Sequence, residues 1–211
     1  MMRIGVIGAG SVGGTLGRRW AERGHEVLFG VRDATEGKVR ELLSASGGRA
    51  RAGSVVQAAA FGEVVVLATP WAAAESALCA AGDLRGKTLL DCTNPLKPDL
   101  TGLTIGHTIS GGEQVAAWAP GAHVVKIFNT TGFDNMADPK YKEGAATMPY
   151  CGDDPSAKTI AANLAADLGF GPLDAGPLAQ ARLLEPYALL WITLAYKQGL
   201  GRNFAFRLVR R

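Results

Sequence analysis

Glycines at positions 8, 10 and 13 stand between an apolar run and an amphipathic stretch near the beginning of the sequence. In a turn from a strand into a helix, Gly8 permits the tight turn, Gly10 lets a pyrophosphate approach the backbone and Gly13 lets the helix lie close to the sheet. The free backbone amides of Ser11 and Val12, with the positive end of the helix dipole, would hold the phosphates. This spacing predicts a site for a dinucleotide cofactor.

The end of the next apolar run, FGVRD, indicates which dinucleotide binds. NAD-binding turns usually carry an acidic residue here, which accepts a hydrogen bond from the adenosine 2′-hydroxyl, whereas an arginine accommodates a 2′-phosphate. Arg32 supplies a planar guanidinium that suits phosphate oxygens, and Gly30 leaves room beside it. The sequence therefore favours NADP over NAD. The alternative is that Arg32 is a surface charge paired with Asp33 or Glu36, and Asp33 could also cap the next helix.

Short polar residues and prolines follow three of the predicted strands. The carboxyl ends of parallel strands meet at one edge of a sheet, and open α/β folds bind their ligands there. Threonine and asparagine would provide polar groups for a ribose and a carboxamide, although turn formation alone could explain each proline. The residues expected at this edge are Thr69, Pro70, Asn94, Pro95, Asn129 and Thr130.

No pattern in the chain predicts a catalytic acid, base or nucleophile. A Ser-His-Asp order is absent, the three histidines lack metal-ligand spacing, and His123 precedes a strand at the wrong end of the sheet. No lysine or histidine is expected beside the nucleotide. The sequence thus predicts neither catalytic residues nor a metal site. Hydride transfer between two bound cofactors fits this pattern, because the cofactors carry the chemistry and the protein orients them.

The elements that would position these residues alternate between short β-branched runs and amphipathic segments, which is typical of a parallel sheet with helices on both faces. Strands are expected at 4–7, 27–29, 49–52, 64–68, 88–91 and 124–128, and helices at 11–23, 35–46, 54–60, 72–80, 112–118, 155–168 and 179–199. The predicted fold class is α/β, a Rossmann-type doubly wound, mostly parallel sheet with a small C-terminal α/β extension. We expect an NADP-binding domain at 1–130 and an acceptor-binding and dimerisation region at 131–211.

The last predicted helix is apolar over much of its circumference. Leu183, Tyr187, Leu190, Trp191 and Leu194 exceed what one buried face of a monomer needs. Two interpretations remain open: a central core helix, or a helix shared across a dimer interface or forming one wall of a ligand pocket.

The composition of the chain is typical of an enzyme and not of a nucleic-acid-binding or membrane-spanning protein. The chain has 211 residues, a formal net charge of +3 and 47% hydrophobic residues, which suits a soluble enzyme and gives no reason to expect nucleic acid as a partner. No apolar run is long enough to cross a bilayer, and no signal peptide precedes the first strand. Three cysteines without CxxC spacing predict a reduced, cytoplasmic compartment in which each thiol is a small buried hydrophobe.

Five ordered stretches carry a family resemblance: RIGVIGAGSVGGTLGRRWAERGHEVLFGVRD, VVVLATPW, VVKIFNTTGFDNM, YCGDDPSAK and GPLDAGPLAQARLLEP. Together they resemble the NADPH-dependent deazaflavin (coenzyme F-420) reductases and the cytosolic domain of the six-transmembrane metalloreductases. The resemblance implies a homodimer in which NADP(H) and a deazaflavin or flavin meet with their reactive carbons face to face. By position, the resemblance implies that the glycine turn holds the pyrophosphate and that Arg32 holds the 2′-phosphate. Thr69 and Pro70 would border the nicotinamide end, with Asn94 and Pro95 nearby. Asn129 and Thr130 would form the floor of the ring-stacking site.

Three positions depart from the deazaflavin reductases. Val31 and Asp33 flank Arg32 where those enzymes have a serine and a second basic residue, and Asn129 replaces a histidine, as in the metalloreductase-type domains. We expect hydride transfer between NADP(H) and a deazaflavin. The alternative is a flavin, quinone or ferric reductase that uses FMN or FAD. Imine or 2-hydroxyacid reduction is disfavoured because those enzymes append a long helical domain, and a non-enzymatic NADP sensor is a further class.

Overall fold

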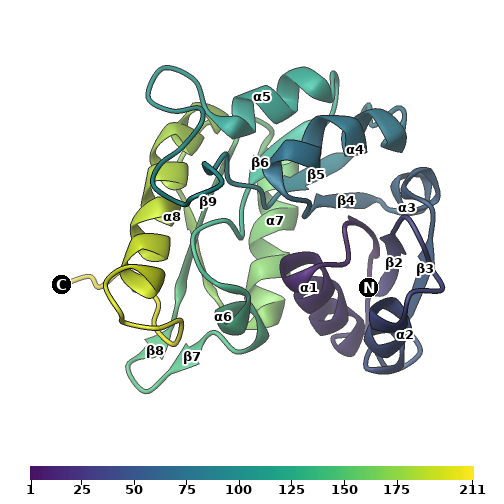
Figure 1. Ribbon diagram of the computed structural model, residues 1–211, viewed down its shortest axis with the longest axis horizontal. Coiled ribbons are helices and arrows are strands. Elements are labelled where there is room, and N and C mark those ends of the chain that lie inside the picture. The colour runs from purple at the N-terminus through teal and green to yellow at the C-terminus, as the bar shows by residue number, and fades with distance from the viewer.

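The computed structural model describes residues 1–211, and its central sheet has eight strands in the order β10-β9-β6-β5-β4-β1-β2-β3 (Figure 1). The strands are β1 (Arg3–Ile7), β2 (Glu26–Gly30), β3 (Ala50–Gly53), β4 (Val64–Leu67), β5 (Thr88–Asp91), β6 (His123–Lys126), β9 (Thr147–Gly152) and β10 (Gly171–Asp174). The chain runs outward to β3 and then returns to β4 on the other side of β1. This reversal is the switch point of a doubly wound fold, and it confirms the predicted Rossmann-type sheet.

Every neighbouring pair of strands is parallel except β6 and β9, which are antiparallel. Because β9 and β10 continue the same sheet, the segment after residue 131 adds strands to the existing layer and does not build a second large sheet. A separate hairpin of β7 (Lys140–Tyr141) and β8 (Gly144–Ala145) projects beyond it.

Helices cover both faces of the sheet (Figure 1). One face carries α1 (Ser11–Glu22), α2 (Gly37–Ser44), α6 (Phe133–Ala137) and α7 (Pro155–Leu168), and the other carries α3 (Val55–Phe61), α4 (Ala74–Ala81) and α5 (Gly111–Trp118). The last long helix, α8 (Ala181–Tyr196), packs against α5, and two short 3-10 turns, η1 (Trp71–Ala73) and η2 (Leu178–Gln180), precede α4 and α8.

Local signals account for several helix boundaries. Ser54 caps α3 and forms a reciprocal capping box with Gln57, which confirms the predicted N-cap. Asp154 caps α7, Pro155 takes its first position, and Gly169 ends it with φ of 100°. The predicted bounds of α7 were therefore correct.

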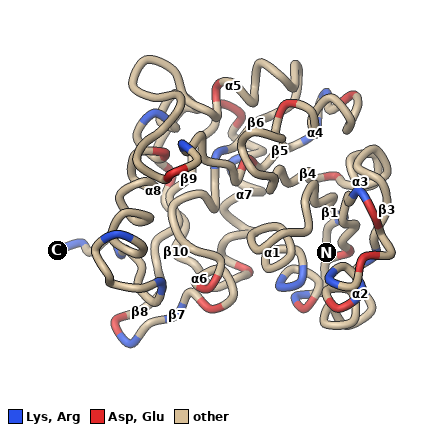
Figure 2. The backbone as a smooth tube through the Cα atoms, viewed as in Figure 1, with Lys and Arg blue, Asp and Glu red and all other residues tan.

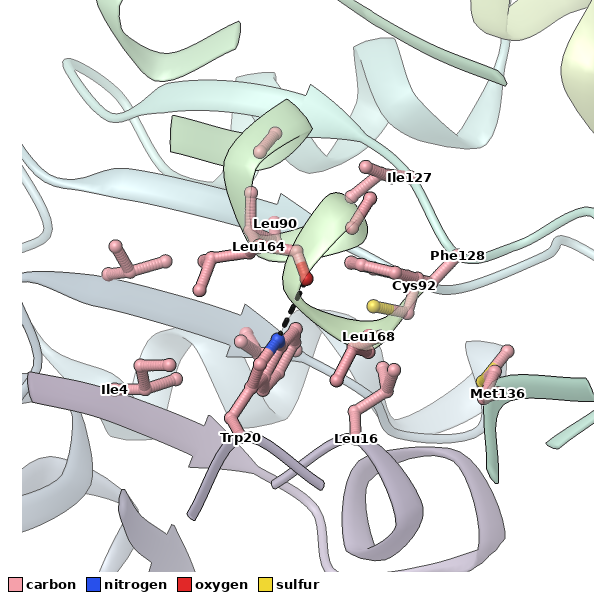
Figure 3. Close-up of a cluster of buried hydrophobic side chains, with 14 of the residues drawn as sticks. Ile4, Leu16, Trp20, Leu90, Cys92, Ile127, Phe128, Met136, Leu164 and Leu168 are labelled. Atoms are coloured by element: carbon pink, nitrogen blue, oxygen red, sulfur yellow. Dashed lines mark hydrogen bonds between the residues drawn. The ribbon is translucent and has the colours of Figure 1, made fainter. Parts of the chain in front are cut away.

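Successive side chains of the central strands point to opposite faces of the sheet, so their apolar residues contribute to two cores. Ile4 and Val6 of β1 join the core under α1 and α7, whereas Ile7 joins the core under α3, α4 and α5. Figure 3 shows the first of these cores, where the indole nitrogen of Trp20 donates a 3.0 Å hydrogen bond to the carbonyl of Leu164. This bond satisfies the polar atom of a fully buried tryptophan and joins α1 to α7.

The last helix lies along the edge of the molecule farthest from β3 (Figure 1). Its inner face buries Ala188 and Trp191, while Leu183 is 66% exposed and Leu190 is 48% exposed. Of the two interpretations, the central core helix is therefore wrong. No helix of the fold combines the length and the hydropathy that a membrane crossing requires.

A tail without regular secondary structure follows α8 and folds back against it. Phe204 stacks on Trp191 with 5.2 Å between ring centroids, and its carbonyl accepts hydrogen bonds from Trp191 and Asn135. The tail thereby ties α8 to α6. Elsewhere, basic and acidic positions are dispersed over many elements of the fold (Figure 2).

Candidate functional site

The glycine turn has the backbone geometry that its sequence predicts. Gly8 follows β1 with φ of +102°, and its amide donates to the carbonyl of Gly30 on the neighbouring strand. A Cβ on Gly8 would lie 2.7 Å from the carbonyl oxygen of Ala68, and a Cβ on Gly13 would lie 2.0 Å from that of Gly8. Both positions therefore require glycine for the protein's own packing.

Gly10 differs, because a Cβ there would meet nothing within 4 Å. Gly10 is the exposed N-cap of α1, and no side chain caps this helix. The first-turn amides of Ser11, Val12 and Gly13 have no acceptor in the protein. The open space over Gly10 and the uncapped helix end fit the pyrophosphate of a dinucleotide.

Beyond β2, Arg32 is exposed and forms no ion pair. The alternative pairing with Asp33 or Glu36 does not occur. Asp33 instead accepts hydrogen bonds from the hydroxyl of Thr35 at 2.6 Å and from its amide at 2.8 Å, and these bonds lower the pKa of Asp33. The suggestion that Asp33 caps the next helix is also wrong, because α2 begins later, after Glu36. The guanidinium of Arg32 is thus exposed and unpaired.

Gly30 has a different role from the expected one. Its missing Cβ would lie 2.9 Å from the Cα of Val55 and 3.0 Å from the Cβ of Ala58. The space beside Gly30 is therefore filled by α3. Glycine at this position allows close packing of α3 on β2 and leaves no room for a phosphate.

The three polar strand ends do gather at one edge. Strands β4, β5 and β6 are parallel neighbours, so the residues after them share one rim of the sheet, as predicted. We call the segments 69–70, 94–95 and 129–130 the rim. The hydroxyl of Thr69 is buried without a hydrogen-bond partner, and the Cγ2 of Thr69 lies 3.4 Å from a Cβ built on Gly8. Thr69 therefore lies beside the glycine turn. Pro70 is exposed, whereas Pro95 is buried.

Asn94 and Asn129 join two of these strand ends. Asn94 Nδ2 donates to the carbonyl of Asn129 at 2.8 Å, and Asn129 Nδ2 donates to Asn94 Oδ1 at 3.0 Å and to the carbonyl of Leu184 at 3.3 Å. Because backbone carbonyls only accept, both amide orientations are fixed. Asn129 Oδ1 is left buried without a donor, and such an atom is costly unless a partner is supplied.

Phe128 ends β6 earlier than the sequence suggested. Its φ of +59° is unusual for a bulky residue, and its ring is buried against Trp20 and Phe170. The strand therefore stops at Lys126, and the backbone turns to direct Asn129 toward α8. Thr130 faces elsewhere: its hydroxyl lies 3.9 Å from the sulfur of Met148 in the core, so its side chain does not line the rim.

A buried charge cluster beneath the rim was missed by the sequence analysis. Lys126, Asp91 and Glu185 are fully buried; the Lys126 Nζ lies 2.6 Å from Asp91 Oδ2 and 2.8 Å from Glu185 Oε1, and it donates to the carbonyl of Thr93 at 2.8 Å. Burial alone would lower the pKa of Lys126, but the two carboxylates outweigh it and raise that pKa. The available signal was a charged residue inside each of three apolar runs, VVKIF, LLDC and LLEPY.

The cysteines offer no reactive thiol at this edge. Cys92 and Cys151 are buried, and burial raises the pKa of both thiols, that of Cys151 to about 12. They remain protonated at neutral pH. Cys79 is exposed, so the expectation that every thiol is buried is wrong for this residue.

A cavity of about 290 Å³ lies at the opposite edge, around the beginning of β6. His123, Asp153 and Asp154 line it, with 3.6 Å between His123 Nδ1 and Asp154 Oδ2. His123 therefore faces away from the rim, as predicted.

Known proteins resemble this chain in sequence and fold. Residues 3–95 match the family described as NADP oxidoreductase, coenzyme F420-dependent, and a crystal structure from Arthrobacter sp. FB24, provisionally described as an F420-dependent NADP reductase, is 34% identical, with a TM-score of 0.90 and complete coverage of both chains. The chain belongs to this F420-dependent NADP oxidoreductase family. The F420-dependent NADP reductase of Methanothermobacter marburgensis is 28% identical over 98% of each chain.

The resemblance to metalloreductases is also confirmed. Metalloreductase STEAP3 of Rattus norvegicus is 31% identical over 191 residues, which are 89% of this chain but only 36% of that protein. The chain therefore spans about a third of that relative's length. A reductive aminase from Aspergillus terreus shares the fold, with a TM-score of 0.67 at 22% identity. Members of the F420-dependent family thus match this chain from end to end, and the other proteins share only a part or the fold.

Proposed function

We propose that this protein is an NADPH-dependent oxidoreductase that transfers a hydride between NADP(H) and a deazaflavin coenzyme. The observation that carries the proposal is the open space over Gly10, beside uncapped helix amides and an unpaired arginine. In this proposal the amides of Ser11 and Val12 bind the pyrophosphate, and Arg32 binds the 2′-phosphate in a charge-assisted pair.

The rim receives the nicotinamide end in the same proposal. Thr69 and Asn129 carry buried polar atoms without partners, and a ribose hydroxyl or a carboxamide can supply the missing hydrogen bonds. Bound nicotinamide cofactors supply a hydride from one ring carbon. The chain's task is to hold the two rings face to face and keep water away. This role agrees with a rim that has no free acid or base.

The acceptor is the finer part of the proposal. Two relatives that this chain matches over nearly its whole length are named F420-dependent NADP reductases, which favours a deazaflavin. The alternative acceptor is FMN or FAD, or through them a quinone or ferric chelate. It is favoured by the 31% identity to a metalloreductase and by Asn129 in the FNT sequence.

We further propose that residues 1–130 bind the dinucleotide and that residues 131–211 bind the acceptor and form a homodimer. The exposed side of α8 carries Leu183, Leu190 and Tyr196, which are 66%, 48% and 55% exposed. An apolar helix face of this kind is typical of an interface between subunits. Free cysteines agree with a reducing, cytoplasmic compartment.

The decisive experiment offers one acceptor at a time to the purified protein with NADPH. Deazaflavin, FMN and FAD are compared by following the absorbance of NADPH, with NADH as the control donor. Loss of deazaflavin colour without turnover of FMN or FAD supports the proposal. Equal rates with all three acceptors would reject a deazaflavin-specific enzyme, turnover of flavins alone would establish the alternative, and binding of NADPH without any turnover would indicate a sensor.

A further inference from the structure

The cluster of Lys126, Asp91 and Glu185 carries an uncompensated charge. Three acceptors surround the Lys126 Nζ within 2.8 Å, namely Asp91 Oδ2, Glu185 Oε1 and the carbonyl of Thr93. An ammonium group has three protons, so this arrangement fits a charged lysine whose donors are all used.

Both carboxyl groups of the cluster accept hydrogen bonds from backbone amides. Glu185 Oε2 accepts from the amide of Gly111 at 2.8 Å, and its Oε1 accepts from the amide of Gly112 at 2.9 Å. Asp91 Oδ1 accepts from the amide and the hydroxyl of Thr93. Three of the four carboxyl oxygens thus accept hydrogen bonds, and the fourth, Asp91 Oδ2, is buried with the Lys126 Nζ beside it. The cluster holds one positive and two negative charges, all fully buried.

Part of the remaining negative charge is balanced by α5. Gly111 and Gly112 open this helix, and its positive end is worth about half a charge. The cluster still remains negative, and no other cation touches it. The second carboxylate, Asp91, also fixes the turn at Thr93, because its Oδ1 accepts from the Thr93 amide and hydroxyl.

The cluster lies directly beneath the rim. The carbonyl that Lys126 contacts belongs to Thr93, the residue before Asn94. Glu185 follows Leu184, whose carbonyl fixes Asn129. The field of the cluster therefore reaches the rim through protein and not through water, and fields in such surroundings are weakly screened.

We propose that this buried negative cluster favours the oxidised, positively charged nicotinamide over the neutral reduced ring, and so makes the bound reduced cofactor a stronger hydride donor. The inference rests on the proposed function, in which the nicotinamide lies at the rim. Fixed charges aimed at the place where charge develops are an established means of catalysis. The three residues act through this field and do not touch the cofactor.

The test compares the dissociation constants of NADP⁺ and NADPH by calorimetry, without any acceptor. The two cofactors share their phosphates and differ in the charge of the ring, so the ratio of the two constants reports on the ring's surroundings. Glu185→Gln removes one negative charge, so the dissociation constant of NADP⁺ should rise by about threefold to tenfold relative to that of NADPH. Lys126→Met should change the ratio in the opposite sense. The double variant restores the original net charge and should restore the ratio.

A purely structural role would change both dissociation constants together. Equal losses for the two cofactors, shifts of the same sign in both single variants, or an altered ratio in the double variant would each overturn the inference. Where Glu185→Gln does not fold, Asp91→Asn replaces it, because its remaining oxygen can keep the Thr93 turn, and the same shift is expected.

Two controls change the charge by the same amount elsewhere. Glu63→Gln lies at the other end of the sheet, where Glu63 pairs with Arg3, and Lys142→Met lies in the exposed hairpin. Neither should alter the ratio. Failure of the unmodified protein to bind either cofactor would reject the proposed function itself, whereas normal binding with an unchanged ratio in every variant would reject only this inference.

Discussion

At the scale of single residues, two glycines of the same turn are required for opposite reasons. Gly13 is glycine because Gly8 occupies the space of a side chain, while Gly10 is glycine although nothing in the protein approaches it. A glycine that the fold does not need, placed at the uncapped end of α1, fits the close approach of a ligand. This contrast separates the cofactor proposal from a purely structural explanation of the motif.

Replacing Gly10 by serine should therefore separate binding from folding. Serine is a good N-cap residue, so we expect Gly10→Ser to keep the free energy of unfolding within about 0.5 kcal/mol. Its side chain would occupy the approach of the pyrophosphate, and the Kd for NADPH should rise about tenfold or more. Urea denaturation and calorimetry measure the two effects.

The matched control is Gly13→Ala, which should lower the free energy of unfolding by about 2 kcal/mol because its Cβ meets the Gly8 carbonyl. Unchanged NADPH binding in Gly10→Ser would contradict the placement of the pyrophosphate.

Arg32 tests the choice of cofactor. Arg32→Ala should raise the KM for NADPH about tenfold and leave that for NADH nearly unchanged, because a hydrogen bond to a charged group contributes about 1.5–3 kcal/mol. Steady-state kinetics with both donors measure the effect, with Arg85→Ala as a control, since Arg85 pairs with Asp83 away from the rim. Equal losses for both donors would show that Arg32 does not bind the 2′-phosphate.

At the scale of elements, α5 and α8 are joined by charge as well as by packing. Glu113 completes the capping box of α5 with Ser110 and also accepts from the guanidinium of Arg182 on α8 at 2.9 Å. The Arg182 guanidinium, followed by the Ser110 hydrogen bonds, lowers the pKa of Glu113 to about 2. The folded protein therefore holds Glu113 ionised under conditions in which the unfolded chain would protonate it.

The stabilisation by Glu113 should depend on pH. The ordinary pKa of this carboxyl is 4.5 and the folded value is about 2, so its contribution is complete above about pH 5 and is lost as pH falls toward 2. Glu113→Gln keeps a capping box but loses the ion pair with Arg182, and it should lower the free energy of unfolding at pH 7 by about 1 kcal/mol. Urea titrations at pH 7 and pH 3 measure the difference, which should shrink at pH 3; a difference independent of pH would contradict this account.

The elements also show where sequence reasoning succeeds. Helix α7 was correctly bounded because Asp154, Pro155 and Gly169 are local signals that act within a turn. Strand β6 was overextended because the left-handed Phe128 depends on packing against Trp20 and Phe170, which lie far away in the sequence. The charge cluster was missed for the same reason: Asp91, Lys126 and Glu185 meet only after β5, β6 and α8 have packed.

At the scale of the whole molecule, the sheet and both of its helical layers were predictable because alternating apolar runs determine a doubly wound fold. The rim also followed from the sequence, since β4, β5 and β6 are parallel neighbours. The roles of Gly30 and Thr130 did not follow, because each depends on which element packs against it.

The exposed side of α8 provides a test of assembly. Leu190→Lys should shift a homodimer toward monomer in sedimentation at micromolar concentration, because it places a charge in a proposed apolar interface. Val56→Lys, at a 52% exposed position on α3, should leave the mass unchanged. A protein that is monomeric before substitution, or a dimer that persists in Leu190→Lys, would reject α8 as the interface.

Phe128 has a consequence for how this chain can vary. Its backbone conformation suits glycine or asparagine, yet its ring fills a space between α1 and the end of α7 that neither replacement could fill. A substitution that relaxes the dihedral angle leaves a hole, and one that preserves the volume retains the strain. Directed evolution toward other hydride acceptors would therefore have to keep Phe128 and vary residues in the loops on either side of it.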